Sequence, residues 1–248
     1  MKTIDDTTQE HGQELSTVEN EENGGTVQIV SCSSSLSTSE CTKIRYYASM
    51  FAGYIFPALE IGSYIGTSTV SIGIEYKAKN NIVYSVDHHR GSEEHHPSGN
   101  NFENCIFDEK TGKINTFEIF RGQIENFGLE KTIIPIVCDS NTVAKHWNIP
   151  LSFLFIDGDH GIEQPVNDVK NFGPYVVEGG LLAMHDVDVY GRIENSYKGP
   201  TTAFFEAIRM GFTPVDYKTS LVFLRKGEPE LYNMSKNDLK EITDFENN

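Results

Sequence analysis

Two apolar runs in this sequence each end in acidic and histidine residues. Residues 151–156 and 180–184 are apolar enough to form buried strands of a parallel sheet. The polar residues that follow these runs are Asp157, His160, His185 and Asp186. In open α/β sheets the ligand crevice lies just outside the carboxyl ends of the strands. We therefore expect these side chains to converge at one edge of a sheet, where they could bind a ligand or move a proton.

The elements that must position these residues follow from an alternation of apolar runs with amphipathic segments. Such an alternation is typical of βαβ units in a parallel sheet. We expect strands at 58–61, 82–86, 133–137, 152–156 and 180–184. Helices are expected at 67–79, 116–127, 141–146, 163–172 and 201–210, after a first helix that starts near Ser39.

The last two apolar runs, 212–217 and 220–225, lie so close together that only an antiparallel hairpin can join them. With this pair the sequence predicts an α/β fold. The fold would be a Rossmann-like, seven-stranded, mostly parallel sheet that closes with the antiparallel hairpin and carries helices on both faces. A short surface helix could follow at 237–245.

A glycine-containing turn connects the first strand to the helix after it. Gly62 and Gly66 lie in this turn, and Glu60 lies on the strand before it. Gly62 would let the backbone approach a ligand closely, and the N-terminus of the helix favours an anionic group. The turn lacks the third glycine of the nicotinamide fingerprint G-x-G-x-x-G. Polar residues also follow the next two strands, namely Asp87, Asp139 and Ser140.

This turn resembles the first motif of the class I methyltransferases that depend on S-adenosylmethionine (SAM). The resemblance covers roughly residues 58–225 and implies SAM as the cofactor. It implies that Asp87 accepts the ribose hydroxyls, that Asp139 lies beside the adenine and that Tyr64 packs near the methionine portion. The cofactor-binding residues implied are Glu60, Gly62, Ser63, Tyr64, Gly66, Thr67, Asp87, Asp139, Ser140 and Asp157.

The segments Asp157-Gly-Asp-His160 and His185-Asp186 are similar to those of macrocin- and mycinamicin-type O-methyltransferases. The resemblance implies a divalent metal held by Asp157, His185 and Asp186, with Asp157 and His160 as catalytic residues. His160 would be the general base that deprotonates the acceptor. Two carboxylates suit Mg²⁺, whereas an imidazole ligand favours Mn²⁺ or another transition metal. Alternatively, His185 lies outside the metal shell.

The function implied is metal-assisted O-methylation of a small hydroxylated molecule by SAM. Three other functions stay open. A nicotinamide-dependent oxidoreductase is disfavoured by the missing glycine and by the lack of a Tyr-x-x-x-Lys catalyst. A non-catalytic protein could retain the cofactor-binding fold. A relative of the cephalosporin-hydroxylase type could share the same segments and run another reaction, which product analysis would reveal.

Length and composition predict one main domain. The chain has 248 residues, of which 38% are hydrophobic. We expect a flexible polar N-terminal segment at 1–38, the methyltransferase domain at 39–226 and a polar C-terminal tail at 227–248. Within the domain, residues 88–113 form a polar loop insertion, and such insertions at strand ends are often functional.

The formal net charge of -16 at pH 7 argues against a nucleic-acid partner, because phosphate contacts need clustered Lys and Arg. No signal peptide and no membrane-spanning run is evident, so we expect a cytoplasmic protein with a small-molecule acceptor and no membrane partner. The cysteines show no C-x-x-C spacing that would indicate a zinc site. A homodimer is possible, and nothing in the sequence decides it.

Half of the 8 histidines lie in the first part of the insertion, at 88–96. They occur as two adjacent pairs that match no zinc motif. We expect a loop that is either solvated or covers the cofactor. The alternative is a substrate-side role for His89, Glu94 or His95.

Overall fold

The computed structural model describes residues 36–92, 95–97, 102, 106–188 and 198–227, together with the backbone of 14–20 and 25–31. The expected C-terminal tail, apart from Gly227, and the helix expected at 237–245 lie outside these residues. Within the described part of the chain, no helix has both the length and the apolar character needed to cross a bilayer.

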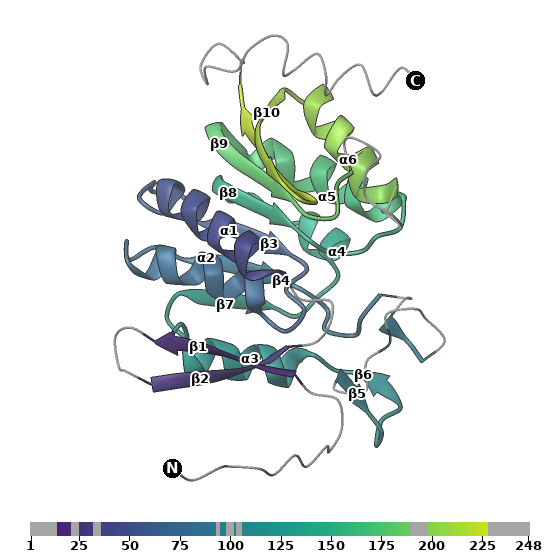
Figure 1. Ribbon diagram of the computed structural model, residues 1–248. Helices are drawn as coiled ribbons and strands as arrows, with labels where there is room; N and C mark the ends of the chain where they lie inside the picture. The colour runs from purple at the N-terminus through teal and green to yellow at the C-terminus, as the bar shows by residue number, and fades with distance from the viewer. Residues whose placement is uncertain are drawn as a thin grey trace.

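A seven-stranded sheet forms the centre of the molecule (Figure 1). Its strands, in spatial order, are β10 (Phe212–Lys218), β11 (Leu221–Lys226), β9 (Val176–Met184), β8 (Leu151–Ile156), β3 (Ala58–Ile61), β4 (Val83–Val86) and β7 (Ile133–Ile136). The pairs from β9 to β7 are parallel, and β11 is antiparallel to both of its neighbours. The predicted fold, with its antiparallel closing hairpin, is confirmed.

Helices cover both faces of the sheet. The side chains of β8 alternate between two apolar cores, because successive residues of a strand point to opposite faces. Phe153 and Phe155 pack in the core that contains residues of α1 (Thr38–Phe51), α2 (Thr67–Lys77) and α3 (Phe117–Asn126). Leu154 and Ile156 pack in the core that contains residues of α4 (Ser140–Ala144), α5 (Glu163–Phe172) and α6 (Lys198–Arg209). Burial on both faces explains the uninterrupted apolar runs of the sequence.

The register brings the carboxyl ends of the central strands to one level. Ile61 at the end of β3 pairs with Val86 of β4 and with Ile156 of β8, and Ile156 pairs with Met184 of β9. The residue that follows each strand therefore emerges at the same edge. Those residues are Gly62, Asp87, Asp157 and His185.

Two short hairpins were not predicted. One, β1 (Glu14–Asn20) with β2 (Gly25–Ser31), lies inside the N-terminal segment that we expected to be flexible. The other, β5 (Phe107–Asp108) with β6 (Lys113–Ile114), lies in the insertion. In addition, β9 begins before the expected position, after a 3-10 turn at Gly173–Tyr175. These elements contain polar and glycine residues, so the search for apolar runs in the sequence did not reveal them.

Gly62 is required where the ends of β3 and β8 meet. Its φ of 83° is in the left-handed region, and a Cβ there would lie 2.1 Å from the carbonyl oxygen of Asp157. From the sequence, a ligand was expected to approach Gly62 closely. In this structure the backbone at the end of β8 makes that close approach instead.

We predict that Gly62→Ala lowers the free energy of unfolding by at least about 3 kcal/mol, since backbone strain and a clash with backbone atoms add together. Gly211→Ala is the matched control, because Gly211 has a φ of 88° but no atom within 4 Å of the position that a Cβ would take. The control should lose about 1–2 kcal/mol from strain alone. Urea unfolding measures both variants, and equal losses would contradict the close approach.

Candidate active site

A cleft of about 530 Å³ opens at the carboxyl ends of the central strands. It contains most of the residues that the sequence singled out. Those that line it are Gly62, Ser63, Tyr64, Thr67, Asp87, Asp139, Ser140, Asp157, His160, His185 and Asp186. Glu60 and Gly66 are not among the lining residues.

Asp87 fixes the glycine turn that forms the floor of the cleft. One oxygen of its carboxylate accepts hydrogen bonds from the backbone N–H groups of Ser63, at 2.9 Å, and Tyr64, at 2.8 Å. The other oxygen accepts from the N–H of His89 at 2.7 Å. These bonds hold Tyr64 at a φ of 47°, a left-handed conformation that is unusual for a residue with a side chain. Asp87 thus joins the turn after β3 to the end of β4.

Glu60 lies beneath this turn and is 0% exposed. Its Oε2 accepts hydrogen bonds from the hydroxyl groups of Thr69 and of Ser85, the latter at 3.0 Å. Its Oε1 has no partner among the described residues. Burial raises the pKa of Glu60 to about 7, although hydrogen bonds from Ser68, Thr69 and Ser85 oppose the rise. The structure places this carboxyl under the cleft wall rather than on it.

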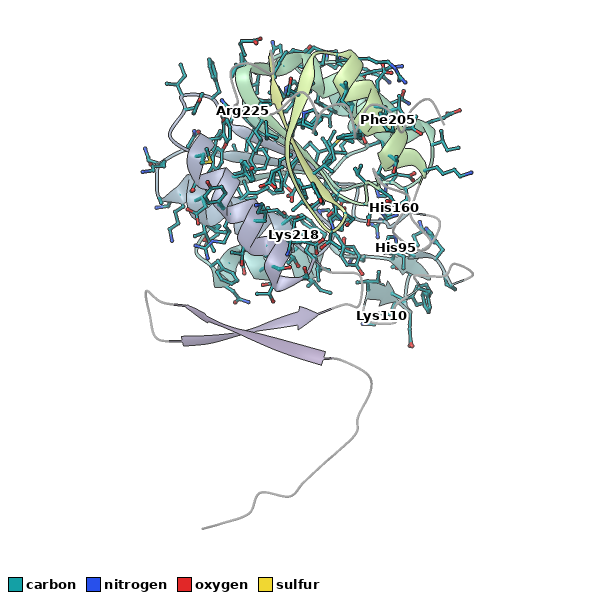
Figure 2. All side chains as sticks on the ribbon, turned by 45° about the horizontal axis from the view of Figure 1, so that its top comes forward. His95, Lys110, His160, Phe205, Lys218 and Arg225 are labelled. Atoms are coloured by element: carbon teal, nitrogen blue, oxygen red, sulfur yellow. The ribbon has the colours of Figure 1, made fainter. Side chains whose placement is uncertain are left out.

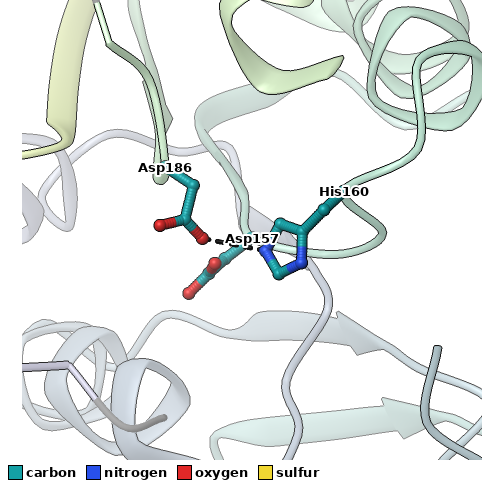
Figure 3. Close-up of side chains that lie close together, drawn as sticks. All are labelled: Asp157, His160 and Asp186. Atoms are coloured by element: carbon teal, nitrogen blue, oxygen red, sulfur yellow. Dashed lines mark hydrogen bonds and ion pairs between the residues drawn. The ribbon is translucent and has the colours of Figure 1, made fainter. Parts of the chain in front are cut away.

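An acid and histidine cluster lies at the ends of β8 and β9. One ligand atom from each of Asp157, His160 and Asp186 lies within 4.8 Å of the others, a grouping that could hold a metal ion. Figure 3 shows the contact between His160 Nε2 and Asp186 Oδ2, which are 2.8 Å apart. Asp186 has a φ of 57°, so a strained backbone turns its side chain at this edge.

His185 lies among three carboxylates. Its Nδ1 is 3.4 Å from Asp157 Oδ1 and 3.3 Å from Asp186 Oδ2, and its Nε2 is 3.3 Å from Glu40 Oε1. Burial alone would lower the pKa of His185, but the attraction of Asp157 and hydrogen bonds to the carboxylates outweigh it and raise the pKa. His185 thus lies beside carboxylates at both ring nitrogens, and its expected role as a metal ligand stays a prediction.

The pKa values of two neighbouring acids, Asp186 and Glu40, shift in the opposite direction. Burial would raise the pKa of Asp186, but hydrogen bonds to His160 and His185 outweigh it and lower the pKa. Burial would likewise raise the pKa of Glu40, but hydrogen bonds from His185 and Ser37 outweigh it and lower the pKa. Three carboxylates thus surround one imidazole in this part of the site. Carboxylate oxygens are ligands that hard divalent cations prefer.

Sequence reasoning missed Glu40, which comes from α1. The residue is 6% exposed and belongs to the capping box that starts this helix, in which its N–H bonds to Ser37 Oγ and its Oε2 accepts from the N–H of Ser37 at 3.0 Å. Its pattern, a serine followed three residues later by glutamate, indicates a helix start. Only the packing of α1 shows that the same carboxylate reaches His185.

A second group of polar residues, from the end of β7 to α5, also lines the cleft. Asp139 caps α4, with its Oδ1 accepting from the N–H of Thr142 at 3.0 Å. The hydroxyl of Ser140 donates to Asp168 Oδ1 at 2.6 Å. Asp168 and Gln164, both on α5, line the cleft here and were also missed. Their sequence pattern is that of an amphipathic helix and carries no sign of a site.

The insertion contributes one wall. His88 and His95 line the cleft, and the ring of His95 lies 5.5 Å from that of Tyr64, measured between centroids. Figure 2 places His95 and His160 on the same side of the molecule. His89 is instead 3% exposed, and its Nδ1 lies 2.7 Å from Thr116 Oγ1. Glu94 lies outside the described residues. The insertion thus reaches the cleft, as a covering loop would.

Comparison with protein families identifies the chain. A family model described as a methyltransferase domain matches residues 59–187, which is more than half of the sequence. The chain belongs to this methyltransferase family. The match spans the glycine turn, Asp87 and the segments that contain the acid and histidine cluster, so most of the cleft is built from the matched region.

Solved structures of O-methyltransferases have the same fold as this methyltransferase. One from Bacillus cereus, in complex with S-adenosylhomocysteine (SAH), is 15% identical, with a TM-score of 0.54 over 78% of this chain and 84% of that one. A putative caffeoyl-CoA O-methyltransferase from Staphylococcus aureus is 14% identical, with a TM-score of 0.53 over 78% and 85% of the two chains. TomG from Streptomyces achromogenes, in complex with SAM, is 10% identical, with a TM-score of 0.50 over 78% and 82%. At these identities the likeness shows the fold alone.

We predict that Glu60→Gln changes how stability depends on pH. Because the folded-state pKa of about 7 exceeds the ordinary 4.5, the folded state holds the proton more tightly. Stability from the protonated form is complete below about pH 4.5 and is lost as pH rises through about 7. The stability of Glu60→Gln relative to wild type should therefore rise by about 2 kcal/mol between about pH 5.5 and 8.5. Urea unfolding at both pH values measures this, and a constant difference would contradict it.

Proposed function

We propose that this protein is a SAM-dependent O-methyltransferase that acts on a small hydroxylated molecule with the help of a divalent metal. The observation that carries the proposal is one cleft, in a methyltransferase family member, that joins a glycine turn fixed by Asp87 to an acid and histidine cluster. The structural relatives support the cofactor, because those from Bacillus cereus and Streptomyces achromogenes hold SAH and SAM. The finer likeness to macrocin- and mycinamicin-type enzymes stays a prediction.

The residues of the glycine turn fit such a cofactor. Ser63 Oγ and Thr67 Oγ1 belong to residues that line the cleft, yet both atoms are buried with no partner among the described residues. Buried hydroxyl groups without partners are uncommon, so both groups need a hydrogen-bond partner that the described residues do not supply. The N-terminus of α2, which starts at Thr67, favours the carboxylate of the methionine portion. We propose that Asp87 accepts hydrogen bonds from the ribose hydroxyls.

The acid cluster fits a divalent cation beside the acceptor. We propose Asp157 and Asp186 as its ligands, since Mg²⁺ is commonly held by one or two carboxylates and keeps several waters. His185 then stays outside the metal shell and compensates part of the negative charge of the carboxylates. When bound, the cation would lower the pKa of an acceptor hydroxyl and fix its orientation.

His160 is proposed as the general base. Its ring nitrogen Nε2 lies 2.8 Å from Asp186, and a carboxylate in this position orients an imidazole and stabilises its protonated form. As the acceptor oxygen forms its bond to the methyl carbon and the bond from that carbon to sulfur breaks, His160 takes the acceptor's proton. SAH and the methyl ether are the products. Proximity and alignment supply much of the rate in such a transfer.

We predict that SAM binds to the purified protein with micromolar affinity in calorimetry. Asp87→Ala should weaken binding by about 1–3 kcal/mol, because the variant removes both the ribose acceptor and the bonds that fix the turn. Glu125→Gln is the control, since Glu125 is an exposed residue of α3 that pairs only with Arg121 in the described part of the chain. No binding to wild type would refute the proposed cofactor.

We predict that Asp157→Asn and Asp186→Asn, which each remove a proposed metal ligand, lower Mn²⁺ affinity more than His160→Ala does, because the latter removes only a hydrogen-bond partner of Asp186 and should cost about tenfold. Electron paramagnetic resonance of added Mn²⁺ measures the free ion directly. If His160→Ala instead loses as much affinity as Asp157→Asn, His160 is a metal ligand and not the base. If neither carboxylate variant changes the affinity, the metal site is absent from this cluster.

The alternative of a nicotinamide-dependent oxidoreductase is tested in the same titration. The family match and the missing third glycine disfavour it. Binding of NAD or NADP in place of SAM would favour it. A non-catalytic protein or a hydroxylase-like relative would bind SAM without methylating any hydroxylated acceptor in a product analysis.

A further inference from the structure

Two residues from outside the matched family domain hold one side of His185. Its Nε2 lies 3.3 Å from Oε1 of Glu40, on α1, and 3.2 Å from Oγ of Ser220, in the turn between β10 and β11. Both partners are buried. The family model covers residues 59–187, so neither partner belongs to it. The contacts that fix this side of the ring are therefore supplied by segments that flank the matched domain.

The other side of the same ring faces the proposed metal ligands. Nδ1 of His185 lies 3.4 Å from Asp157 Oδ1 and 3.3 Å from Asp186 Oδ2. Two neighbouring carboxylates repel each other, and a donor beside both of them relieves the repulsion. Because the imidazole ring is rigid, a partner that fixes Nε2 also fixes Nδ1. The contacts with Glu40 and Ser220 can therefore set how the two carboxylates lie.

The carboxylate of Glu40 divides its oxygens between two partners. Oε2 accepts hydrogen bonds from the N–H of Ser37, at 3.0 Å, and from its hydroxyl, at 2.6 Å, whereas Oε1 faces His185. The bonds with Ser37 belong to the capping box, a role that glutamine fills as well as glutamate. Burying a charge is unfavourable unless it is paired, so capping alone does not explain a carboxylate at this position. The contact with His185 does explain it.

Helix α1 is attached to the sheet by other contacts as well. The hydroxyl of Tyr47 donates to Asp216 Oδ2 of β10 at 2.9 Å, and the ring of Tyr47 stacks on Phe223 of β11 with 4.1 Å between centroids. Residues of α1 also pack in the apolar core on that face of the sheet. The contact between Glu40 and His185 can therefore be removed while these attachments keep the helix in place.

We propose that Glu40 is a positioning residue of the metal site, which together with Ser220 holds the ring of His185 so that Nδ1 stays beside the two carboxylates. The inference rests on the proposed function, because the carboxylates are the metal ligands proposed there. It adds a residue of α1 that acts on the metal only through His185. Partners of this outer kind orient the ligands that contact a metal directly.

Binding of Mn²⁺ to the full-length protein, measured by electron paramagnetic resonance, tests this role without any acceptor. Glu40→Gln keeps a side chain that can complete the capping box but removes the charge that faces His185. It should weaken Mn²⁺ binding by about tenfold, as the loss of an outer-shell partner typically does. Its SAH affinity in calorimetry should equal that of wild type, because the change touches neither the glycine turn nor Asp87.

Tyr47→Phe is the matched control. It also removes a hydrogen bond between α1 and the sheet, but it leaves Glu40 and His185 intact and keeps the ring that stacks on Phe223. This variant should bind Mn²⁺ as wild type does. Equal losses of Mn²⁺ affinity in Tyr47→Phe and Glu40→Gln would overturn the proposal, because they would show that α1 acts only through its general attachment.

A double-mutant cycle shows whether Glu40 acts through His185. In His185→Asn the side chain is too short to reach Glu40, so this variant should itself lose Mn²⁺ affinity by about tenfold. Adding Glu40→Gln to it should cause no further loss, because the ring that transmits the effect is gone. Losses that add in the double variant would overturn the proposal.

The remaining outcomes separate this inference from the proposed function. If wild type binds Mn²⁺ and Glu40→Gln binds it equally well, this inference alone is refuted. A parallel loss of SAH affinity in Glu40→Gln overturns it too, since it indicates a general disturbance of the cleft. If His185→Asn fails to fold, the comparison of Glu40→Gln with Tyr47→Phe decides. If wild type binds no Mn²⁺, the proposed metal and this inference fail together.

Discussion

Compensation of negative charge at one edge of the sheet is the constraint on which the site depends. The parallel register brings the ends of β8 and β9 to the same level, so Asp157 and Asp186 emerge side by side. Carboxylates this close repel each other unless a cation or a donor lies between them. His185 occupies that position and takes a third carboxylate, Glu40, on its other nitrogen. A single imidazole thus links the sheet edge to α1.

This link has a consequence for the shape of the cleft. Glu40 is at once the N3 residue of the capping box of α1, in which Ser37 is the N-cap, and a partner of His185. The same carboxylate therefore helps to fix the start of the helix and contacts a residue of the site. Leu36, just before the helix, lines the cleft. The start of α1 therefore contributes to the lining of the cleft.

The sheet was predictable because the burial of its strands leaves a local and repeated apolar pattern in the sequence. All residues of β8 are buried, so the strand reads as one apolar run that ends abruptly at Asp157. The turn after β3 was recognisable from its glycine spacing taken together with the acids at the ends of the following strands. In contrast, Glu40 and Asp168 gain their roles from the packing of separate helices, and each has a sufficient local explanation as a cap or as a polar residue of an amphipathic helix. His185 was predicted at the site, but its three carboxylate neighbours come from the tertiary structure.

The central claim is that the cleft binds SAM with its sulfonium at the acid and histidine cluster. A crystal structure of the protein grown with SAH and Mn²⁺ tests this most directly. Our account predicts SAH along the glycine turn, its sulfur facing Asp157 and His160, its adenine beside Asp139 and Ser140, and the metal on Asp157 and Asp186. A cleft that stays empty at saturating SAH, or SAH bound elsewhere on the protein, would contradict it.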